Sequence, residues 1–339
     1  MSDAAPADLA AAEIRDFADT VAAVRREVAR VVVGHADTID AVLTAFFAGG
    51  HVLIEGVPGI GKTLLARAVA DALGLSLCRI QFTVDLMPAD VTGTRIVEDG
   101  ADGRRAFRFV PGPLFAHVVL ADEVNRATPR TQSALLEAMA EEQVTVAGTT
   151  HALPAPFFVL ATLNPIEMEG TYRLPEAQLD RFLFKVVLGY PSQDELERIV
   201  GSTTGADVPR VRPVLAADDA PARTLALRRL VRRVLVAPHV ERYVATLVRA
   251  TLPGPAGDPE VTRWVSYGAS PRAGQALALG ARVHALLDGR AHVTPDDVDR
   301  VALPALRHRL VLNFAAETAA VDAATLVEHV RRTAARSRA

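Results

Sequence analysis

Residues 56–63 read GVPGIGKT, a glycine-rich run that ends in a lysine and a threonine. The run fits the pattern G-x-x-x-x-G-K-T between a predicted strand and a predicted helix, the context that a phosphate-binding loop requires. Its glycines let backbone N–H groups face phosphate oxygens, and the helix adds the positive end of its dipole. Lys62 would contact the β- and γ-phosphates, and Thr63 would place a hydroxyl on Mg²⁺. The predicted nucleotide-binding residues of this loop are Gly56, Pro58, Gly59, Ile60, Gly61, Lys62, Thr63 and Leu64.

Lysine is rare in this chain. Of the 37 basic residues, only Lys62 and Lys185 are lysines. A planar guanidinium is a poor substitute for the compact ammonium that a phosphate loop needs, so a lysine at position 62 favours nucleotide binding over an accidental match. Lys185 is interpreted as a surface residue at a strand end.

Two adjacent acids follow the apolar run VVLA at 118–121. Asp122 would hold Mg²⁺ through water, and Glu123 would polarise the water that attacks the γ-phosphate. The alternative is an acid pair that the dipole favours at a helix N-terminus. The phosphate loop upstream favours the catalytic interpretation. Glu123 also separates two classes of function, because a nucleotide-gated binding module could dispense with a water-activating group.

A third apolar run, FFVLAT at 157–162, ends near Asn164 and Pro165. The amide of Asn164 would contact both the γ-phosphate and the attacking water; the alternative is an Asn-Pro turn. Sheets of this class bind ligands at the carboxyl ends of their strands, so another polar strand end favours the site. Arg181, in LPEAQLDRF, is either a salt-bridged helix residue or a catalytic group that acts on the substrate of another copy.

Strands that alternate with helices are expected to position these residues. Apolar runs predict strands at 51–55, 75–82, 118–121, 157–162 and 184–188. The main N-terminal helices are expected at 8–32, 37–48, 64–73 and 126–139. This order predicts an α/β fold of the P-loop NTPase class, a five-stranded parallel sheet with helices on both faces. Hairpin insertions are expected near 94–113, with the turn at Asp-Gly-Ala-Asp-Gly, and at 144–153.

Two domains are expected within the 339 residues, an ATP-binding core at 1–190 and a smaller all-α domain at 191–339. The net charge of −3 argues against a bulk polyanion binder. Cys78, the sole cysteine, is interpreted as a buried packing residue. The acidic N-terminus lacks a signal-peptide pattern, and no uncharged apolar stretch reaches the ~18 residues of a membrane span. A cytoplasmic protein without a membrane span is therefore expected.

The order of these motifs resembles the AAA+ ATPases, and more closely their MoxR family. The residues that carry the resemblance are VVVGH, HVLIEGVPGIGKT, LADEVNRATPRTQSALLEAM, ATLNP, LPEAQLDRF, GASPRA and LRHRL. The phosphate loop alone is common to many NTPases, whereas LADEVNRA followed by QSALLEAM, together with GASPRA, is far more specific. The two hairpin insertions also resemble those of this family.

The resemblance implies roles that spacing alone does not assign. Asn164 matches the sensor-1 position, and Arg272 matches sensor 2, which would reach the γ-phosphate of the same chain. A helix-start salt bridge is the alternative for Arg272. Val33 and Gly34 match the segment that packs against adenine. Arg181 matches the arginine finger, which acts on the nucleotide of a neighbouring copy.

The function implied is ATP hydrolysis with Mg²⁺ by a hexameric, chaperone-like ring that remodels or activates a protein client. A partner with a von Willebrand A domain is also implied. Arg126 and Arg130 either line a subunit interface or form a solvated helix face.

Three other functions compete with this one. The chain could be the ATPase subunit of a metal chelatase, since those ATPases share the two hairpins. It could be a nucleic-acid motor, because RRAFRF at 104–109 mixes arginines with aromatics that could stack bases. The net acidity speaks against a backbone tracker. A non-hydrolysing switch is disfavoured by Glu123.

Overall fold

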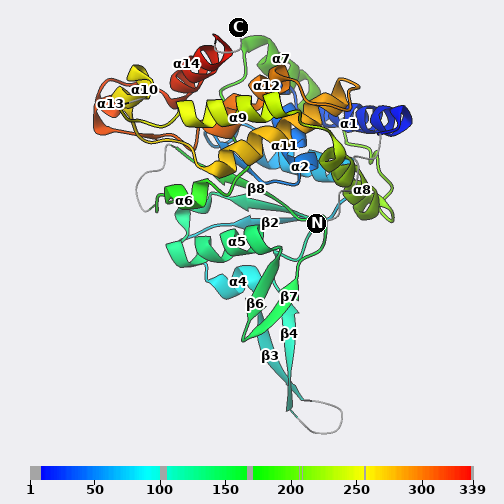
Figure 1. Ribbon diagram of the computed structural model, residues 1–339. Coiled ribbons are helices and arrows are strands. Elements are labelled where there is room, and N and C mark those ends of the chain that lie inside the picture. The colour runs from blue at the N-terminus through cyan, green and yellow to red at the C-terminus, as the bar shows by residue number, and fades with distance from the viewer. Residues whose placement is uncertain are drawn as a thin grey trace, which may run out of the picture.

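The computed structural model describes residues 9–99, 105–165, 171–205, 207, 209–255 and 257–336. A parallel sheet lies at its centre, with most of the C-terminal helices on one side and two hairpins on the opposite side (Figure 1). The five strands are β1 (Val52–Glu55), β2 (Leu77–Gln81), β5 (Val118–Asp122), β8 (Phe158–Leu163) and β9 (Phe184–Val187). Their order is β2-β5-β8-β1-β9, and every neighbouring pair is parallel. The expected five-stranded parallel sheet is confirmed.

Alternate residues of the strands enter two hydrophobic cores, one on each face of the sheet. On β8, Phe158 and Leu160 belong to the first core, and Val159 and Ala161 to the second. Helices α1 (Ala11–Val31), α2 (Ala36–Ala48) and α3 (Lys62–Ala72) cover the first face. Helix α5 (Pro129–Glu141) covers the second, next to the short α4 (Pro88–Thr92). Burial on both faces explains why the strands are continuous apolar runs rather than alternating ones.

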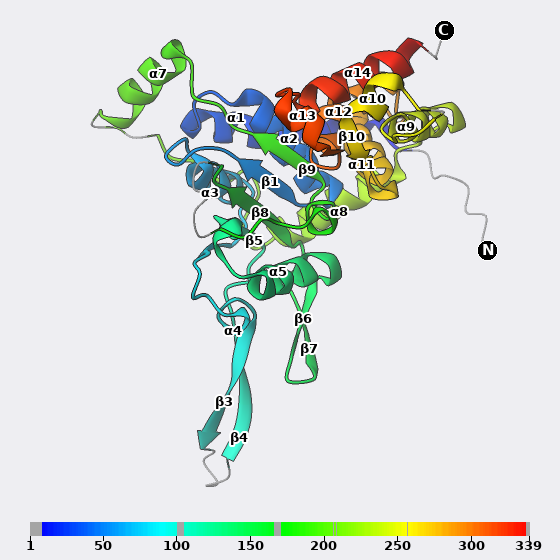
Figure 2. The same ribbon diagram turned by 90° about the vertical axis from the view of Figure 1, so that its left-hand side faces the viewer.

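Two antiparallel hairpins extend from the sheet in the same direction (Figure 2). The first pairs β3 (Gly93–Asp99) with β4 (Arg105–Pro111), and the second pairs β6 (Gln143–Val146) with β7 (Thr149–Ala152). The rings of Phe109 and His151 stack with centroids 3.8 Å apart, which joins the two hairpins. Both expected hairpins are therefore present. The turn expected in the first falls largely on residues 100–104, outside the described residues.

The C-terminal part of the chain is helical, as expected. Its helices are α7 (Gln193–Thr203), α8 (Ala220–Arg233), α9 (Pro238–Ala250), α10 (Pro259–Trp264), α11 (Pro271–Leu287), α12 (Pro295–Leu306), α13 (Phe314–Thr318) and α14 (Ala323–Arg336). It also contains a strand pair that sequence reasoning missed, β10 (Val265–Tyr267) with β11 (Val311–Leu312). Strands of three and two residues are too short to show an alternating pattern, so helical periodicity concealed them.

The C-terminal helices share one continuous core with α1, α2 and the first face of the sheet. Helix α11 approaches edge strand β9 so closely that a Cβ on Gly280 would lie 2.7 Å from the Phe184 ring. The same Cβ would lie 3.1 Å from Val301 of α12. Only glycine allows this approach, which holds the start of α11 at a defined place relative to the sheet. The domain boundary after residue 190 stays a prediction.

Lys185 lies near the start of β9, as expected, but it is partly buried and paired. Its ammonium forms a 2.6 Å ion pair with Glu55, the last residue of β1, and only 20% of its side chain is exposed. The pair joins two neighbouring strands directly before the phosphate loop. Cys78 is only partly buried, on edge strand β2. Among the described residues, no helix combines the length and apolar character that a membrane crossing demands.

Candidate nucleotide-binding and hydrolysis site

The phosphate loop connects β1 to α3, as the sequence predicts. Gly59 and Gly61 have φ values of +83° and +92°, and a Cβ on either would meet nothing within 4 Å. Glycine is therefore needed for backbone conformation rather than for space. The Lys62 ammonium is buried and donates to the Gly56 carbonyl at 2.5 Å and the Leu163 carbonyl at 3.4 Å. Because Leu163 ends β8, the lysine joins the loop to the strand that precedes Asn164.

Asp122 is a buried carboxylate at the end of β5. One oxygen accepts a 2.7 Å hydrogen bond from Thr162 of β8, and the other accepts from Arg79 of β2 at 2.7 Å and 3.1 Å. The described residues hold no group of three His, Cys, Asp or Glu side chains that would cage a metal. Mg²⁺ needs only one or two protein oxygens beside phosphates and water. The hydroxyl of Thr63 and the carboxylate of Asp122 are hard oxygen donors that fit it.

Glu123 directly follows β5 in a left-handed backbone conformation, with φ at +57°. Its N–H donates to the Thr162 hydroxyl at 2.8 Å. Its carboxylate accepts hydrogen bonds at 3.0 Å from both Gln81 and Arg126. The side chain is 17% exposed. The carboxylate is thus held by two donors on different elements, Gln81 at the end of β2 and Arg126 on the short helix η1 (Val124–Arg126).

Sequence reasoning missed two residues of this site, Arg79 and Gln81. Both lie on β2, and Gln81 is in register with Asp122 of the adjacent strand. A polar residue at the carboxyl end of a neighbouring strand was the available signal, the same one that singled out Asn164. The side chain of Arg126 pairs with Glu123 and remains 42% exposed, so the choice between a subunit interface and a solvated face stays open. Arg130 is exposed near the start of α5.

Asn164 is buried directly after β8, and its carbonyl accepts a 3.4 Å hydrogen bond from Asn125. It lies at the same edge of the sheet as the phosphate loop and the acid pair, because all five strands are parallel. Of the other loop residues, Ile60 packs against Gly56, and Leu64 is exposed on the first turn of α3. Their contacts with a nucleotide stay predictions, as does that of Pro58.

Val33 and Gly34 lie between α1 and α2, where the adenine-contacting segment is expected. Gly34 has φ at +75°, and a Cβ there would lie 2.7 Å from the carboxylate of Glu195 on α7. The segment therefore adjoins the helix that follows the sheet. Its contact with adenine stays a prediction.

Arg181 and Arg272 lie at the opposite edge of the sheet. The backbone N–H of Leu183 donates to the carbonyl of His51, so Arg181 precedes β9 just as Gly50 precedes β1. A cavity of about 240 Å³ is lined by both arginines and by Gly50. At ~3.3 Å per extended residue, Gly50 and Gly56 are roughly 20 Å apart along β1.

Arg272 therefore lies near the edge of the sheet opposite the phosphate loop, and its contact with a γ-phosphate stays a prediction. Its guanidinium lies 3.6 Å from the carboxylate of Asp180, the residue before Arg181. The motif GASPRA identified a helix start, but only the packing of α11 on β9 determines which edge of the sheet that start adjoins. A helix-start ion pair, the alternative weighed for this arginine, is what the isolated chain forms.

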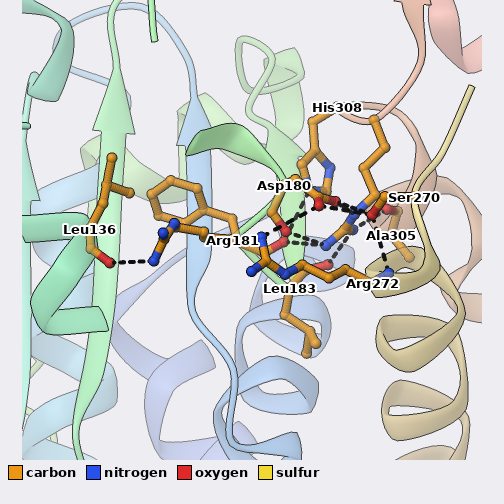
Figure 3. Close-up of polar contacts among 10 residues, drawn as sticks. Leu136, Asp180, Arg181, Leu183, Ser270, Arg272, Ala305 and His308 are labelled. Atoms are coloured by element: carbon orange, nitrogen blue, oxygen red, sulfur yellow. Dashed lines mark hydrogen bonds and ion pairs between the residues drawn. The ribbon is translucent and has the colours of Figure 1, made fainter. Parts of the chain in front are cut away.

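Asp180 is the centre of a polar cluster that joins the two arginines (Figure 3). It follows the short helix α6 (Glu176–Leu179). Arg181 extends from it toward α5 and donates to the Leu136 carbonyl at 3.1 Å. Ser270, the residue before α11, donates to both Asp180 oxygens at 2.8–2.9 Å and accepts from the N–H of Arg272 at 3.1 Å. About half of the Arg272 side chain remains exposed.

Comparison with known proteins identifies the family of the chain. Residues 51–184 match the ATPase family associated with various cellular activities (AAA), and residues 261–330 match the AAA lid domain. The chain is 43% identical over 310 residues to chaperone MoxR1 of Mycobacterium tuberculosis, which covers 91% of this chain and 80% of that protein. It is 36% identical over 315 residues to protein MoxR of Methylorubrum extorquens, covering 89% and 90%. A crystal structure of a putative ATPase from Cytophaga hutchinsonii superposes with a TM-score of 0.85 at 38% identity, covering 95% of this chain and 96% of that one. The chain therefore belongs to the MoxR family of AAA+ ATPases, with an α/β AAA domain followed by a helical lid domain.

Proposed function

We propose that the protein hydrolyses ATP with Mg²⁺ in a ring whose active sites are each completed by two copies of the chain. One observation carries the proposal. The phosphate loop, acid pair and Asn164 lie at the carboxyl edge of the sheet, whereas Arg181 and Arg272 lie at the opposite edge. In this arrangement both arginines lie away from the chain's own phosphate loop, which supports the proposal that a neighbouring copy supplies them.

Each side chain has a distinct part in this reaction. Lys62 and the N-terminus of α3 would bind the phosphates, and Asn164 would orient the attacking water. Thr63 and Asp122 would hold Mg²⁺, which neutralises phosphate charge when bound. Glu123 would accept the proton of the attacking water. The two arginines of the neighbour would stabilise the charge that develops on the transferred phosphoryl group, an effect worth ~10³-fold or more in rate.

Such a contact between opposite faces is head-to-tail, and it closes into a ring when the rotation between copies allows. We propose a hexamer, following the family resemblance. We also propose that this ring is cytoplasmic, where cellular ATP is available to it.

The surface of the β3–β4 hairpin supports the proposal that the client is a protein. Phe107 and Val97 are cross-strand neighbours, 66% and 54% exposed, and Arg95 lies over the Phe107 ring. Exposed apolar side chains on a protruding element suit an unfolded or partly folded polypeptide. The hairpin arginines are less suited to nucleic acid, because Arg108 pairs with Glu98 and Arg105 with Asp99. We further propose, from the family resemblance, a partner with a von Willebrand A domain.

Mixing two inactive variants tests the shared site. Lys62→Ala removes the phosphate contact but leaves the arginines, and Arg181→Ala does the reverse. Each variant alone should lose ~10³-fold in turnover, and the mixture should recover a substantial fraction of wild-type turnover. Arg242→Ala, which changes an exposed arginine on α9, is the matched control for loss of charge. A mixture no more active than the two variants apart would show that the arginines do not act between copies.

A further inference from the structure

Arg309 is a buried arginine whose five N–H groups are all used as donors. Its Nε donates to the Asp180 carboxylate at 2.8 Å. One terminal nitrogen donates to the Asp180 and Phe182 carbonyls at 3.0 Å and 2.7 Å. The other donates to the Leu183 carbonyl at 3.1 Å and to the Ala305 carbonyl. A guanidinium carries five N–H donors, so its hydrogen-bonding capacity is filled.

These contacts hold the backbone on either side of Arg181. The carbonyls on both sides of it, those of Asp180 and Phe182, accept from the same guanidinium group. His308 adds a 3.1 Å hydrogen bond to the Phe182 carbonyl. Arg309 itself follows α12, and only 3% of its side chain is exposed. Arg309 of the helical lid domain thus binds the backbone on both sides of Arg181, which belongs to the core domain.

The same cluster ties Arg272 to this backbone. Ser270 hydrogen-bonds the Asp180 carboxylate and also caps the first turn of α11, on which Arg272 lies. Asp180 therefore contacts both the serine at the start of α11 and the arginine after α12. The segment that carries Arg181 and the helix that carries Arg272 share one carboxylate as their common support.

The charges of the cluster leave the two exposed arginines available to an anion. Asp180 lies 2.8 Å from Arg309 but 3.6 Å from Arg272. Burial lowers the pKa of Arg309, and its contact with Asp180 opposes that shift. The carboxylate thus mainly offsets the buried guanidinium, while Arg181 and Arg272 present positive charge at the surface. All five donors of the buried Arg309 guanidinium have acceptors, so moving it would leave buried polar groups unpaired, which restrains the cluster.

We infer that Arg309 is a positioning residue that sets the geometry of Arg181 and Arg272 as one unit, which acts on the nucleotide of the neighbouring copy. The inference rests on the proposed function and extends it, because it assigns to the lid a part in catalysis that needs no contact with ATP. Lysine cannot replace Arg309, because an ammonium has three donors and no planar fork. Arg309→Lys should therefore retain the charge and lose the alignment.

The test places Arg309→Lys in one kind of copy at a time. Copies with Lys62→Ala donate arginines, and copies with Arg181→Ala hold ATP. Adding Arg309→Lys to the donor copies should lower the kcat of the mixed rings by between about 10-fold and 100-fold, because displacements near 1 Å are costly in catalysis. The KM for ATP should change by less than about 2-fold, since ATP is bound by the other copy. Adding it instead to the ATP-holding copies should cause no further loss.

The controls separate positioning from folding and from the ring itself. Arg307→Lys in the donor copies changes the neighbouring arginine, which lines the separate cavity between α2, β9 and α12, and should leave kcat near that of the unaltered mixture. Asp180→Asn in the donor copies should reproduce the loss. Equal loss from Arg309→Lys in either kind of copy would indicate a general folding defect and overturn the inference, as would an unchanged kcat in the donor copies. A failure of the parent mixture to recover activity would instead contradict the proposed shared site.

Discussion

The carboxylate of Glu123 accepts hydrogen bonds from Gln81 and Arg126, whereas that of Asp122 accepts from Arg79 and Thr162. The two acids thus differ in partners although they are adjacent in sequence. Asp122 is bound by donors from β2 and β8, the strands on either side of β5. This arrangement suits the fixed role beside a metal that is proposed for Asp122, and a water-activating role is proposed for Glu123.

Glu123→Gln tests this division at the scale of one residue. The amide keeps the size of the side chain but cannot accept a proton, so ATP should still bind while turnover falls by ~10²- to 10⁴-fold. Binding is measured by titration with ATP, and turnover by release of phosphate. Glu137→Gln, at an exposed position on α5, is the control. Unchanged turnover in Glu123→Gln would show that another group activates the water.

At the scale of elements, the helical lid domain is held against the sheet rather than set apart from it. Helices α11 and α12 pack on α2 and β9, and Gly280 permits the approach. The lid therefore fixes the edge that carries Arg181 and Arg272. The two hairpins differ from the lid helices. They extend beyond the sheet and expose Phe107 and Val97 instead of burying them.

The β3–β4 hairpin should couple ATP turnover to a polypeptide. In Phe107→Ser, basal turnover should stay within about 2-fold of wild type, because the hairpin lies outside both cores, while stimulation by an unfolded polypeptide such as reduced casein should be lost. The measurement is phosphate release with and without the polypeptide. Phe314→Ser, which changes an 82% exposed phenylalanine on α13, should retain stimulation. Salt-sensitive DNA binding that Phe107→Ser abolishes would instead favour the nucleic-acid motor.

At the scale of the whole molecule, the residues of the candidate nucleotide site lie at one edge of the sheet, and Arg181 and Arg272 lie at the other. Under the proposed function, this polarity would leave the isolated chain an incomplete hydrolase. Both faces are present on every copy, so the proposed self-assembly would supply what each copy lacks.

Turnover per chain should therefore rise with protein concentration until assembly is complete. Phosphate release is measured over a dilution series, with sedimentation to follow the oligomer. Arg181→Ala should stay low at every concentration, because assembly cannot supply the missing guanidinium. A rate per chain that is constant through the range where the protein dissociates would contradict the shared site.

Much of the fold and the phosphate site could be predicted from the sequence because the signals are local. The strands are apolar runs, the helices have regular spacing, and the phosphate loop is eight consecutive residues with their chemistry intact. The carboxyl ends of parallel strands meet at one edge, so Asp122, Glu123 and Asn164 could be placed together before any packing was known. Gln81 follows the same rule but lies on a strand with weaker apolar character, and was missed.

Sequence alone thus determined which residues could bind and hydrolyse a nucleotide, since that information is carried by short motifs and strand ends. Only the tertiary structure decided which of them one chain can bring together. Arg272 is separated from Lys62 by about two hundred residues, and its place depends on how α11 packs against β9 and how Asp180 contacts Ser270. Arg309 is one arginine among 35 in the sequence, and the positioning role proposed for it rests on burial among carbonyls that no local pattern brings near it. Long-range packing determines which edge of the sheet each side chain reaches, and the proposal that hydrolysis needs a second copy rests on that placement.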